Sequence, residues 1–491
     1  MRFVPETYTI RLGPRETFLR IRKEPFGCSI FDTKATCECN QSFYDIVLKI
    51  IRGRRKSAVT ELAEDYQISE EESLEGYAAF LQFFLRKGWI TSEKELDIIR
   101  LLDHKTLPPL NLETLYTMAP NSIDYHITMR CNLACSHCGF YERMVRDEVT
   151  PELTTEEWYH ILEQLDANGV MQILITGGEP LLRNDLLDVV SFAARKTNLY
   201  IVINTNGILW KEDEVREVAE VTGDRGIMVI SLDGHSPETY GTIRKRKDGN
   251  SAGEYFENVI ETARLAEKYN AQFSFIVVLS KATYWHSLDT VQWILEEFPG
   301  ASNVNVLRFD LTGETKKGLD LTYKEWKEWL HKATPLKEKH RNRFILSVAC
   351  GGELYLPLKG DDNVLRVWDN NIVTPLTSEM YRRRRNVGCH AAITDLSIAP
   401  DGKIYACGLY TGVPEWYIGD LSYNSFYEIW HHGEDINKFR YLDIEQINAP
   451  CSRCETRQLC GGGCRGRAFA ATGSIYGPDP YCPYAWRELH E

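Results

Sequence analysis

Fourteen cysteines, unevenly spread along 491 residues, constrain this chain more than any other feature of its sequence. None falls between Cys138 and Cys350, and seven lie between Cys389 and Cys482. The opening segment MRFVPETYTIRLG has no apolar stretch typical of a secretion signal, so we do not expect a disulfide scaffold. Clustered cysteines in such a chain indicate metal ligands or redox groups.

Composition and charge exclude several classes of protein. Apolar residues make up 43% and charged residues 26%, which is ordinary for a globular chain of about two to four domains. The net charge of −13 disfavours general nucleic-acid binding, because such binding neutralises phosphates. No apolar run reaches the roughly 18 residues of a membrane helix. We therefore expect a cytoplasmic protein that binds neither nucleic acid nor membrane.

Residues 1–100 are predicted to form a winged-helix-like α+β domain. The patterns predict strands and then helices at Thr17–Lys23, Phe26–Asp32, Ser42–Ile51, Ser57–Tyr66 and Glu72–Lys87. Sixteen basic and sixteen acidic residues leave this domain without a basic footprint for DNA. An exposed sheet edge could instead receive a peptide as an added strand. Residues 101–120, interrupted by prolines, are predicted to be a linker.

Residues 121–335 alternate between strand and helix patterns, which predicts a parallel sheet in a partial (β/α)6 barrel. Strands are expected at Ile123–Thr128, Gln172–Thr176, Tyr200–Asn204, Ile227–Leu232, Phe273–Leu279 and Val304–Phe309. Helices are expected at Thr155–Asn168, Leu186–Arg195, Glu212–Val221, Tyr255–Lys268 and Ser287–Glu297. Barrels of this kind carry their chemistry at the carboxyl ends of the strands. Residues 336–388 look irregular and polar, a bridging region, and the Cys-rich residues 389–491 are expected to need metal to fold.

The strongest motif, Cys131-Asn-Leu-Ala-Cys135-Ser-His-Cys138, follows the first barrel strand. Three thiolates within eight residues can hold three irons of a cubane cluster, leaving a fourth iron open. Zinc fits less well, because the segment offers no obvious fourth ligand.

This spacing resembles that of the radical S-adenosylmethionine (SAM) superfamily, and the supporting motifs Thr176–Pro180, Asn204–Gly207 and Ser231–Gly234 follow in order. The resemblance makes Glu179 a partner of the methionine ammonium and Arg244 a partner of its carboxylate. His137 stands where the family usually places an aromatic ring against the adenine. The residues thereby assigned to SAM binding are His137, Gly177, Gly178, Glu179, Asn206, Ser231, Asp233 and Arg244.

The resemblance also implies a mechanism. A [4Fe-4S] cluster on Cys131, Cys135 and Cys138 donates an electron to SAM, and the resulting 5′-deoxyadenosyl radical abstracts hydrogen from an unactivated carbon. The electron is expected to come from a reduced flavodoxin or a ferredoxin-type protein.

The C-terminal cysteines resemble the SPASM domain, which binds auxiliary iron–sulfur clusters in peptide-modifying radical SAM enzymes. The matching positions are Cys389, Cys407, Cys451, Cys454, Cys460, Cys464 and Cys482. In the family's arrangement, Cys389, Cys407 and Cys464 hold a first cluster, and the other four hold a second. A zinc ribbon is the alternative, because paired cysteines at such spacings often bind zinc.

Cys350 precedes Cys389 by 39 positions, farther than is usual for a fourth ligand of the first auxiliary cluster. It is either a buried inert thiol or the ligand that closes this cluster. Without it, an open iron could hold a substrate thiolate. Cys28, Cys37 and Cys39 are interpreted as ordinary thiols. The run Arg382–Arg385 is interpreted as a solvated surface stretch, with acidic peptide or phosphate binding as the alternative.

A winged-helix-like domain ahead of these two domains resembles the leader-recognition element of enzymes that modify ribosomally made peptides. We therefore predict a radical SAM maturase that binds a precursor peptide through its leader and installs a thioether or carbon–carbon crosslink. The alternatives are radical epimerisation, oxidation of a protein residue as in sulfatase maturation, and a non-catalytic, metal-stabilised peptide-binding protein.

Overall fold

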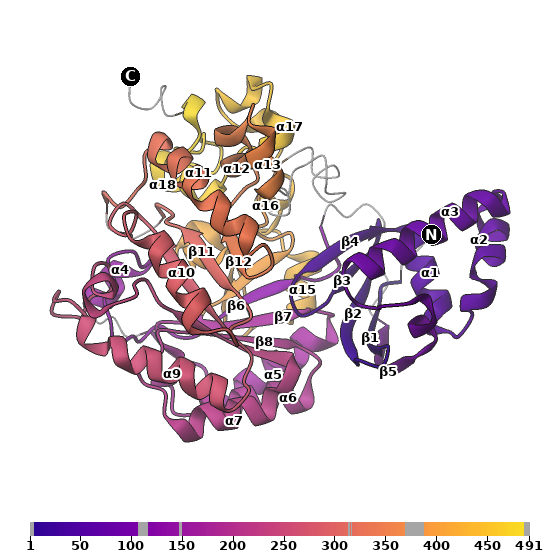
Figure 1. The fold of residues 1–491 in the computed structure, drawn as a ribbon, viewed down its shortest axis with the longest axis horizontal. Coiled ribbons are helices and arrows are strands. Elements are labelled where there is room, and N and C mark those ends of the chain that lie inside the picture. The colour runs from indigo at the N-terminus through magenta and orange to yellow at the C-terminus, as the bar shows by residue number, and fades with distance from the viewer. Residues whose placement is uncertain are drawn as a thin grey trace. The chain divides into compact units, whose positions relative to one another are not determined.

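A computed structural model describes residues 4–106, 116–146, 150–312, 315, 317–368 and 387–485. The chain divides into two compact units (Figure 1). The first contains Met1–Asn121 and Leu165–Met171, and the second contains Ser122–Gln164 and Gln172–Glu491. The run Arg382–Arg385 lies outside the described residues.

The first unit is built on a five-stranded antiparallel sheet in the order β4-β3-β2-β1-β5. Its elements are β1 (Glu6–Leu12), β2 (Thr17–Glu24), β3 (Gly27–Phe31), β4 (Thr36–Asn40), α1 (Gln41–Ile51), α2 (Ala58–Tyr66), α3 (Glu70–Arg86) and β5 (Ile99–Thr106). The expected strands and helices are present. Residues 101–106, placed in a linker by the sequence, lie instead in β5. Its side chains are largely exposed and do not alternate between apolar and polar, so the sequence shows no strand pattern there.

A buried ion pair fixes the middle of this sheet. Arg22 and Glu24 are both fully buried on β2, with Nε and Oε1 2.6 Å apart. Glu24 also accepts hydrogen bonds from the Ser29 hydroxyl and from the Met118 backbone. Arg22 donates to the Gly169 carbonyl at 2.9 Å, so the separate segment of this unit is tied to its sheet. Burying both charges is tolerated only because each has several polar partners.

The second unit contains a ten-stranded sheet in the order β12-β11-β10-β9-β8-β7-β6-β13-β14-β15. Its strands are β6 (Ser122–Thr128), β7 (Gln172–Gly177), β8 (Tyr200–Thr205), β9 (Gly226–Ser231), β10 (Phe273–Leu279), β11 (Val304–Arg308), β12 (Phe344–Ser347), β13 (Asp395–Ile398), β14 (Lys403–Tyr405) and β15 (Tyr417–Asp420). All neighbours from β12 to β13 pair in parallel. The predicted α/β class with a parallel sheet is confirmed. The bridging region, expected to be irregular, contributes β12 as a further strand.

Helices connect and cover these strands (Figure 1). They are α4 (Tyr141–Arg146), α5 (Thr155–Ala167), α6 (Leu186–Lys196), α7 (Glu212–Thr222), α8 (Pro237–Tyr240), α9 (Phe256–Lys268), α10 (Ser287–Glu297), α11 (Tyr323–Lys339), α12 (Gly352–Leu358), α13 (Asp362–Trp368), α15 (Phe426–His432), α16 (Asn437–Arg440), α17 (Arg457–Cys460) and α18 (Arg465–Thr472). The five predicted barrel helices are present within one or two residues of their expected ends.

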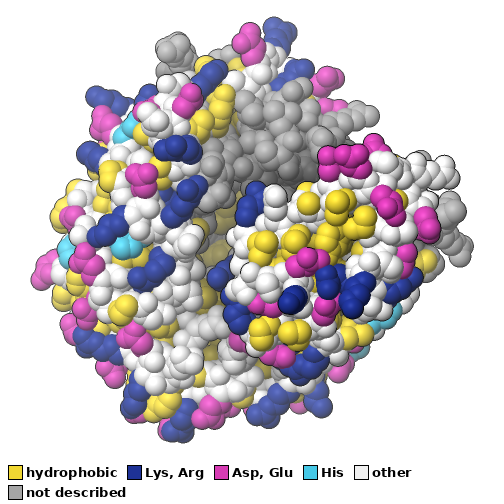
Figure 2. All heavy atoms as spheres, turned by 45° about the vertical axis from the view of Figure 1, so that its right-hand side comes forward, with side chains coloured by type: hydrophobic (Ala, Val, Ile, Leu, Met, Phe, Trp, Pro, Cys, Tyr) yellow, Lys and Arg dark blue, Asp and Glu magenta, His cyan; other side chains and the backbone are white. Residues whose placement is uncertain are grey.

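The Cys-rich region shares its sheet with the barrel. Strand β13 pairs with β6 from Asp395 opposite Ser122 to Ile398 opposite Tyr125. Within the described residues, no helix has the length and apolar character needed to cross a bilayer. Acidic and basic side chains are intermixed over the face shown in Figure 2.

Candidate active site

The three motif cysteines lie on a loop that begins where β6 ends. Backbone hydrogen bonds hold this loop, because Ala134 donates to the Lys245 carbonyl at 2.8 Å and Ser136 donates to the Ile243 carbonyl at 3.1 Å. The backbone N–H groups of Leu133 and Phe140 point at the sulfurs of Cys131 and Cys138, at 3.5 and 3.4 Å. Such donors stabilise thiolates, the form that binds iron.

Two glycines let the end of β7 lie directly against this loop. A Cβ atom on Gly177, whose φ is +127°, would come within 1.9 Å of the Thr128 carbonyl oxygen. A Cβ atom on Gly178 would come equally close to the Arg130 carbonyl oxygen. The Gly178 and Glu179 amides donate to those two carbonyls, each at 2.8 Å. The glycines therefore join β7 to the cysteine loop, besides lining the cavity described below.

Glu179 is buried at the start of the next turn. Its carboxylate accepts hydrogen bonds from the Thr205 hydroxyl and the Asn206 amide, both at 2.7 Å. Burial raises its pKa to about 7, against the lowering effect of these donors. The Asn206 side chain in turn donates to Asn132 of the cysteine loop at 2.7 Å. Glu179 thus links the ends of β7 and β8. It does not line the cavity described below, whereas its hydrogen-bond partner Asn206 does.

A buried ion pair sets the position of Arg244. Asp233, with no exposed surface, accepts from Arg244 Nε at 2.5 Å and from the Val278 amide at 2.6 Å. Arg244 lines the cavity, but Asp233 does not. Burial, followed by the positive charge of Arg244, lowers the pKa of His137 to about 4. The predicted SAM residues therefore divide into lining groups, which include the neutral His137, and the supporting carboxylates Glu179 and Asp233.

The residues around this loop enclose a cavity of about 560 Å³. At β6 to β9 it is lined by Cys131, Cys135, His137, Cys138, Gly177, Gly178, Asn206, Ser231 and Arg244. At β11 and β12 it is lined by Arg308, Asp310, Thr312, Ser347 and Ala349. Leu409, two residues after Cys407, also reaches it. The cavity therefore spans the carboxyl ends of the parallel strands and is large enough for a cofactor and part of a substrate.

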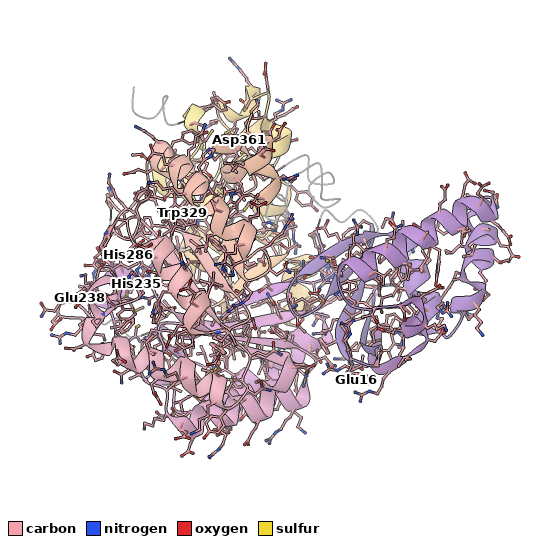
Figure 3. The ribbon with its side chains drawn as sticks, viewed as in Figure 1. Glu16, His235, Glu238, His286, Trp329 and Asp361 are labelled. Atoms are coloured by element: carbon pink, nitrogen blue, oxygen red, sulfur yellow. The ribbon has the colours of Figure 1, made fainter. Side chains whose placement is uncertain are left out.

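Two histidines hold the turns behind this cavity. His235, after β9, and His286, at the start of α10, lie close together in Figure 3. Their Nδ1 atoms are 3.0 and 3.2 Å from the Thr290 hydroxyl. Trp329 of α11 donates to Ser287 at 2.9 Å, which anchors the same helix. This cluster supports the turn that carries Asp233.

Three of the Cys-rich region's thiols lie near one another. Burial raises the pKa of Cys407, and its neighbours Cys464 and Cys389 raise it further. Such a group of desolvated thiols fits a cluster, because thiolates on iron lose the mutual repulsion that they have alone.

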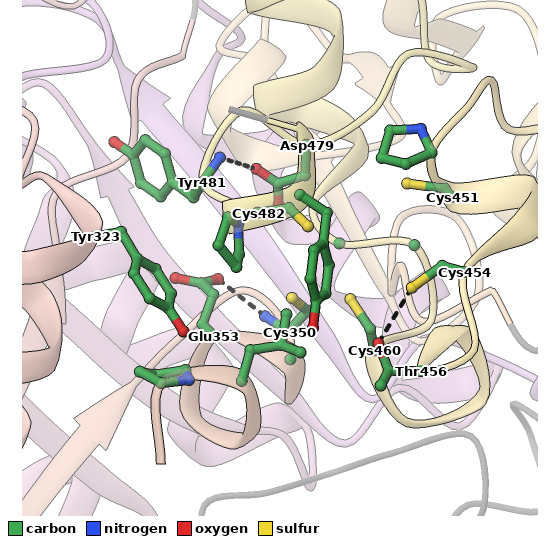
Figure 4. A pocket seen from close by; sticks show the side chains of 18 of the residues that line it. Tyr323, Cys350, Glu353, Cys451, Cys454, Thr456, Cys460, Asp479, Tyr481 and Cys482 are labelled. Atoms are coloured by element: carbon green, nitrogen blue, oxygen red, sulfur yellow. Dashed lines mark hydrogen bonds between the residues drawn. The ribbon is translucent and has the colours of Figure 1, made fainter. Parts of the chain in front are cut away.

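A second set of thiols lines another pocket (Figure 4). Its cysteines are Cys350, Cys451, Cys454, Cys460 and Cys482. Cys350 lies beside Cys460, since both line this pocket and a Cβ atom on nearby Gly352 would lie only 2.6 Å from the Cys460 sulfur. The structure places Cys350 beside the second set, whereas the sequence assigned it to the first set, so its part as a cluster ligand stays a prediction.

No three His, Cys, Asp or Glu side chains of the described residues converge as they would on a single metal ion. An iron–sulfur cluster does not need that convergence, because sulfides separate its irons.

A buried charge network, which the sequence did not reveal, lies between the cavity and the thiols. Arg467 contacts Glu353 at 2.6 Å, Asp479 at 2.7 Å, and also Asp310. Asp479 accepts a hydrogen bond from the Cys464 amide at 2.7 Å. The residues of this charge network come from distant segments of the chain, so no local motif could indicate it.

Comparisons with known proteins agree with this arrangement. Residues 125–294 match the radical SAM superfamily, and residues 389–455 match SPASM, an iron–sulfur cluster-binding domain. The chain is 26% identical over 370 residues to the AdoMet-dependent heme synthase of Methanosarcina barkeri, covering 75% of this chain and 97% of that one. It is 26% identical over 374 residues to the PqqA peptide cyclase of Bradyrhizobium diazoefficiens, covering 76% and 88%.

Among solved structures, SuiB of Streptococcus suis bound to S-adenosylmethionine has the same fold over nearly the whole chain. The TM-score is 0.65 at 18% identity, with 95% of this chain and 98% of SuiB covered. SuiB has also been solved with its precursor peptide SuiA.

Proposed function

The chain is a radical SAM enzyme with a SPASM domain, and we propose that it installs a thioether or carbon–carbon crosslink in a ribosomally made precursor peptide. Its cofactors are SAM, a [4Fe-4S] cluster and auxiliary iron–sulfur clusters. The names of two similar proteins support a peptide substrate, since one is a PqqA peptide cyclase and the other, SuiB, was solved with a precursor peptide.

The observation that carries this proposal is the extent of the cavity. It begins at the three motif cysteines and continues to the ends of β11 and β12 and to Leu409, near Cys407. A substrate inside it would lie between the SAM site and the first auxiliary thiols. That placement suits a reaction in which the substrate loses a hydrogen atom at the SAM site and an electron toward the first auxiliary thiols.

The chain's own residues prepare the cavity for SAM. Cys131, Cys135 and Cys138 would hold three irons, and bound SAM would supply the 5′-deoxyadenosyl radical. Arg244, fixed by Asp233, presents a guanidinium suited to a carboxylate. Glu179 supplies a negative charge behind Asn206 for the ammonium group.

Epimerisation fits the cavity less well. It needs a hydrogen-atom donor, typically a thiol. Within the part of the chain that the structure describes, the three motif cysteines are the sole thiols on the cavity wall. Cys350, the first candidate from the sequence, faces the pocket that contains Cys460. Crosslinking therefore remains the better-supported outcome.

The N-terminal unit supports leader recognition. Its five-stranded sheet offers an edge to which a leader can add as a strand. The likeness to SuiB extends over 95% of this chain, whereas the likeness to heme synthase covers 75%. We keep a cytoplasmic location and a reduced flavodoxin or ferredoxin-type donor as parts of this proposal.

The test is co-expression with a small peptide encoded beside the gene, in ordinary and in deuterated water. Crosslinking predicts a loss of two hydrogens per event, with fragmentation locating the bond. The Cys131→Ala variant is the control and should leave the peptide unchanged. An unchanged mass that gains deuterium would replace crosslinking by epimerisation. A peptide untouched under conditions where SAM is cleaved would contradict the peptide substrate.

A further inference from the structure

The first auxiliary site has three cysteines and lacks a fourth thiol. Cys389, Cys407 and Cys464 lie near one another, whereas Cys350 lines the other pocket together with Cys460. A four-iron cluster held by three thiolates keeps one iron for another ligand. The question is which group of this chain stands beside the three thiols.

Asp124 of β6 points toward this site. Tyr125 packs on Trp158 of α5, with ring centroids 4.3 Å apart, so its neighbour Asp124 projects from the opposite face of the strand. There Asp124 Oδ2 occupies the space beside Gly408, because a Cβ atom on that glycine would lie 1.9 Å from this oxygen. Gly408 directly follows Cys407. The missing side chain at 408 thus admits a carboxylate next to a cluster thiol.

The Asp124 carboxylate has no compensating partner among the described residues. No hydrogen bond or ion pair to it is formed there, although its side chain is partly buried. A partly buried carboxylate without a polar partner is available to bind a cation.

We propose that Asp124 is the fourth ligand of the first auxiliary cluster, together with Cys389, Cys407 and Cys464. The other nearby carboxylates are already engaged, since Asp310 and Asp479 both pair with Arg467 and Asp395 accepts a hydrogen bond from the Thr394 hydroxyl. Carboxylates are established iron ligands, so the donor set is chemically sound. The inference rests on the SPASM assignment and is independent of the peptide's identity.

Asp124 ligation has a consequence for the proposed function. With all four irons held by the chain, the first auxiliary cluster offers no site to a substrate thiolate. Its part in crosslinking is then to accept the surplus electron. The peptide thiol or carbon that forms the new bond must be positioned by the cavity wall instead.

The test uses full-length protein in which Cys131, Cys135 and Cys138 are all changed to Ala, so that auxiliary clusters dominate the spectra. Asp124→Cys and Asp124→Asn are compared with the parent by potentiometric titration followed by electron paramagnetic resonance. Asp395→Asn is the matched control, because Asp395 is the neighbouring buried carboxylate.

We expect Asp124→Cys to move one auxiliary potential to more negative values, because a thiolate donates more electron density than a carboxylate. Asp124→Asn should open an iron, so that added small-molecule thiol changes the spectrum of that variant. Added thiol should leave the spectra of the parent and of Asp395→Asn unchanged.

The proposal is overturned if the parent itself responds to added thiol, a measurement that needs no further variant. Unchanged potentials in both Asp124 variants would overturn it as well. Because neither readout involves a peptide, failure of the crosslinking assay would leave this result intact, and the reverse also holds.

Discussion

Glu179 is a buried carboxylate that titrates close to neutrality. Burial raises its pKa to about 7, so the ionised fraction changes across the ordinary assay range. Pairing with the SAM ammonium requires the ionised form. Below its pKa the carboxylate is mostly protonated, so we predict that SAM affinity falls as the pH drops through 7, by up to about tenfold per pH unit, and levels off above it.

Calorimetric titration with SAM measures this effect. Glu179→Gln should bind SAM weakly at every pH and show little pH dependence. Glu238→Gln, at an exposed glutamate in the same domain, is the control and should behave like the parent. A parent affinity that stays flat from about pH 6 to about pH 8 would contradict a role for the Glu179 charge.

Cys350 is the residue whose role the structure changes most. It lies beside Cys460, which the family arrangement makes a ligand of the second auxiliary cluster. A thiol that donates a hydrogen bond to a cluster sulfur stabilises the reduced cluster, so we predict that Cys350→Ala makes that cluster's potential more negative without loss of iron. Cys460→Ala should lose the cluster, and Cys37→Ala should change neither quantity. Iron analysis and a redox titration measure the two effects. Loss of iron in Cys350→Ala would contradict the prediction and show that this cysteine is a ligand.

At the residue scale, sequence reasoning succeeds where chemistry is local. The spacing of Cys131, Cys135 and Cys138 within one loop marks a cluster site without knowledge of the fold. The placement of Asp124 beside Gly408 depends on contact between segments almost 300 residues apart, and no spacing in the chain carries that information.

The junction of β7 with the cysteine loop depends on Gly178. A Cβ atom there would overlap the Arg130 carbonyl oxygen at 1.9 Å, and backbone cannot move aside without displacing the loop. We predict that Gly178→Ala costs more than about 3 kcal/mol and reduces cluster content. Thermal unfolding and iron analysis measure the two effects.

Gly249→Ala is the matched control for this substitution. Gly249 has a φ of +82°, and a methyl group added there would have no atom within 4 Å, so only the left-handed backbone is penalised. Its expected cost is about 1–2 kcal/mol, with full cluster content. Equal melting temperatures for the two variants would show that the Arg130 carbonyl leaves room for a methyl group at Gly178, against the prediction.

At the scale of elements, the six barrel strands and five helices were predictable because buried strands and amphipathic helices alternate regularly. The strands that were not predicted are β1, β4, β5, β12, β13, β14 and β15. The physical reason is clear for two of them. Strand β5 (Ile99–Thr106) is largely exposed and pairs with β1, more than 85 positions earlier in the chain, so neither its pattern nor its neighbours reveal it. Strand β12 (Phe344–Ser347) has four residues, too few to show a period.

At the scale of the whole molecule, the parallel sheet makes the barrel depend on the Cys-rich region. Strand β13 pairs with β6, and β6 leads directly into the cysteine loop. Leu396 and Ile398 of β13 are 1% and 0% exposed. Without β13, strand β6 would become an unprotected edge carrying exposed backbone groups and apolar neighbours, which favours aggregation.

We therefore predict that a chain ending at Gly388 fails to bind the radical SAM cluster, although all three of its cysteines remain. The comparison is full-length protein with Cys451, Cys454 and Cys460 changed to Ala, which should lose the second auxiliary cluster but keep the pairing of β13 with β6. That variant should still cleave SAM under reducing conditions, whereas the shortened chain should be found in the insoluble fraction. The comparison separates the loss of β13 from the loss of the second auxiliary cluster, because both proteins lack that cluster. A soluble shortened chain that cleaves SAM at the parent rate would show that β6 needs no neighbour on that side.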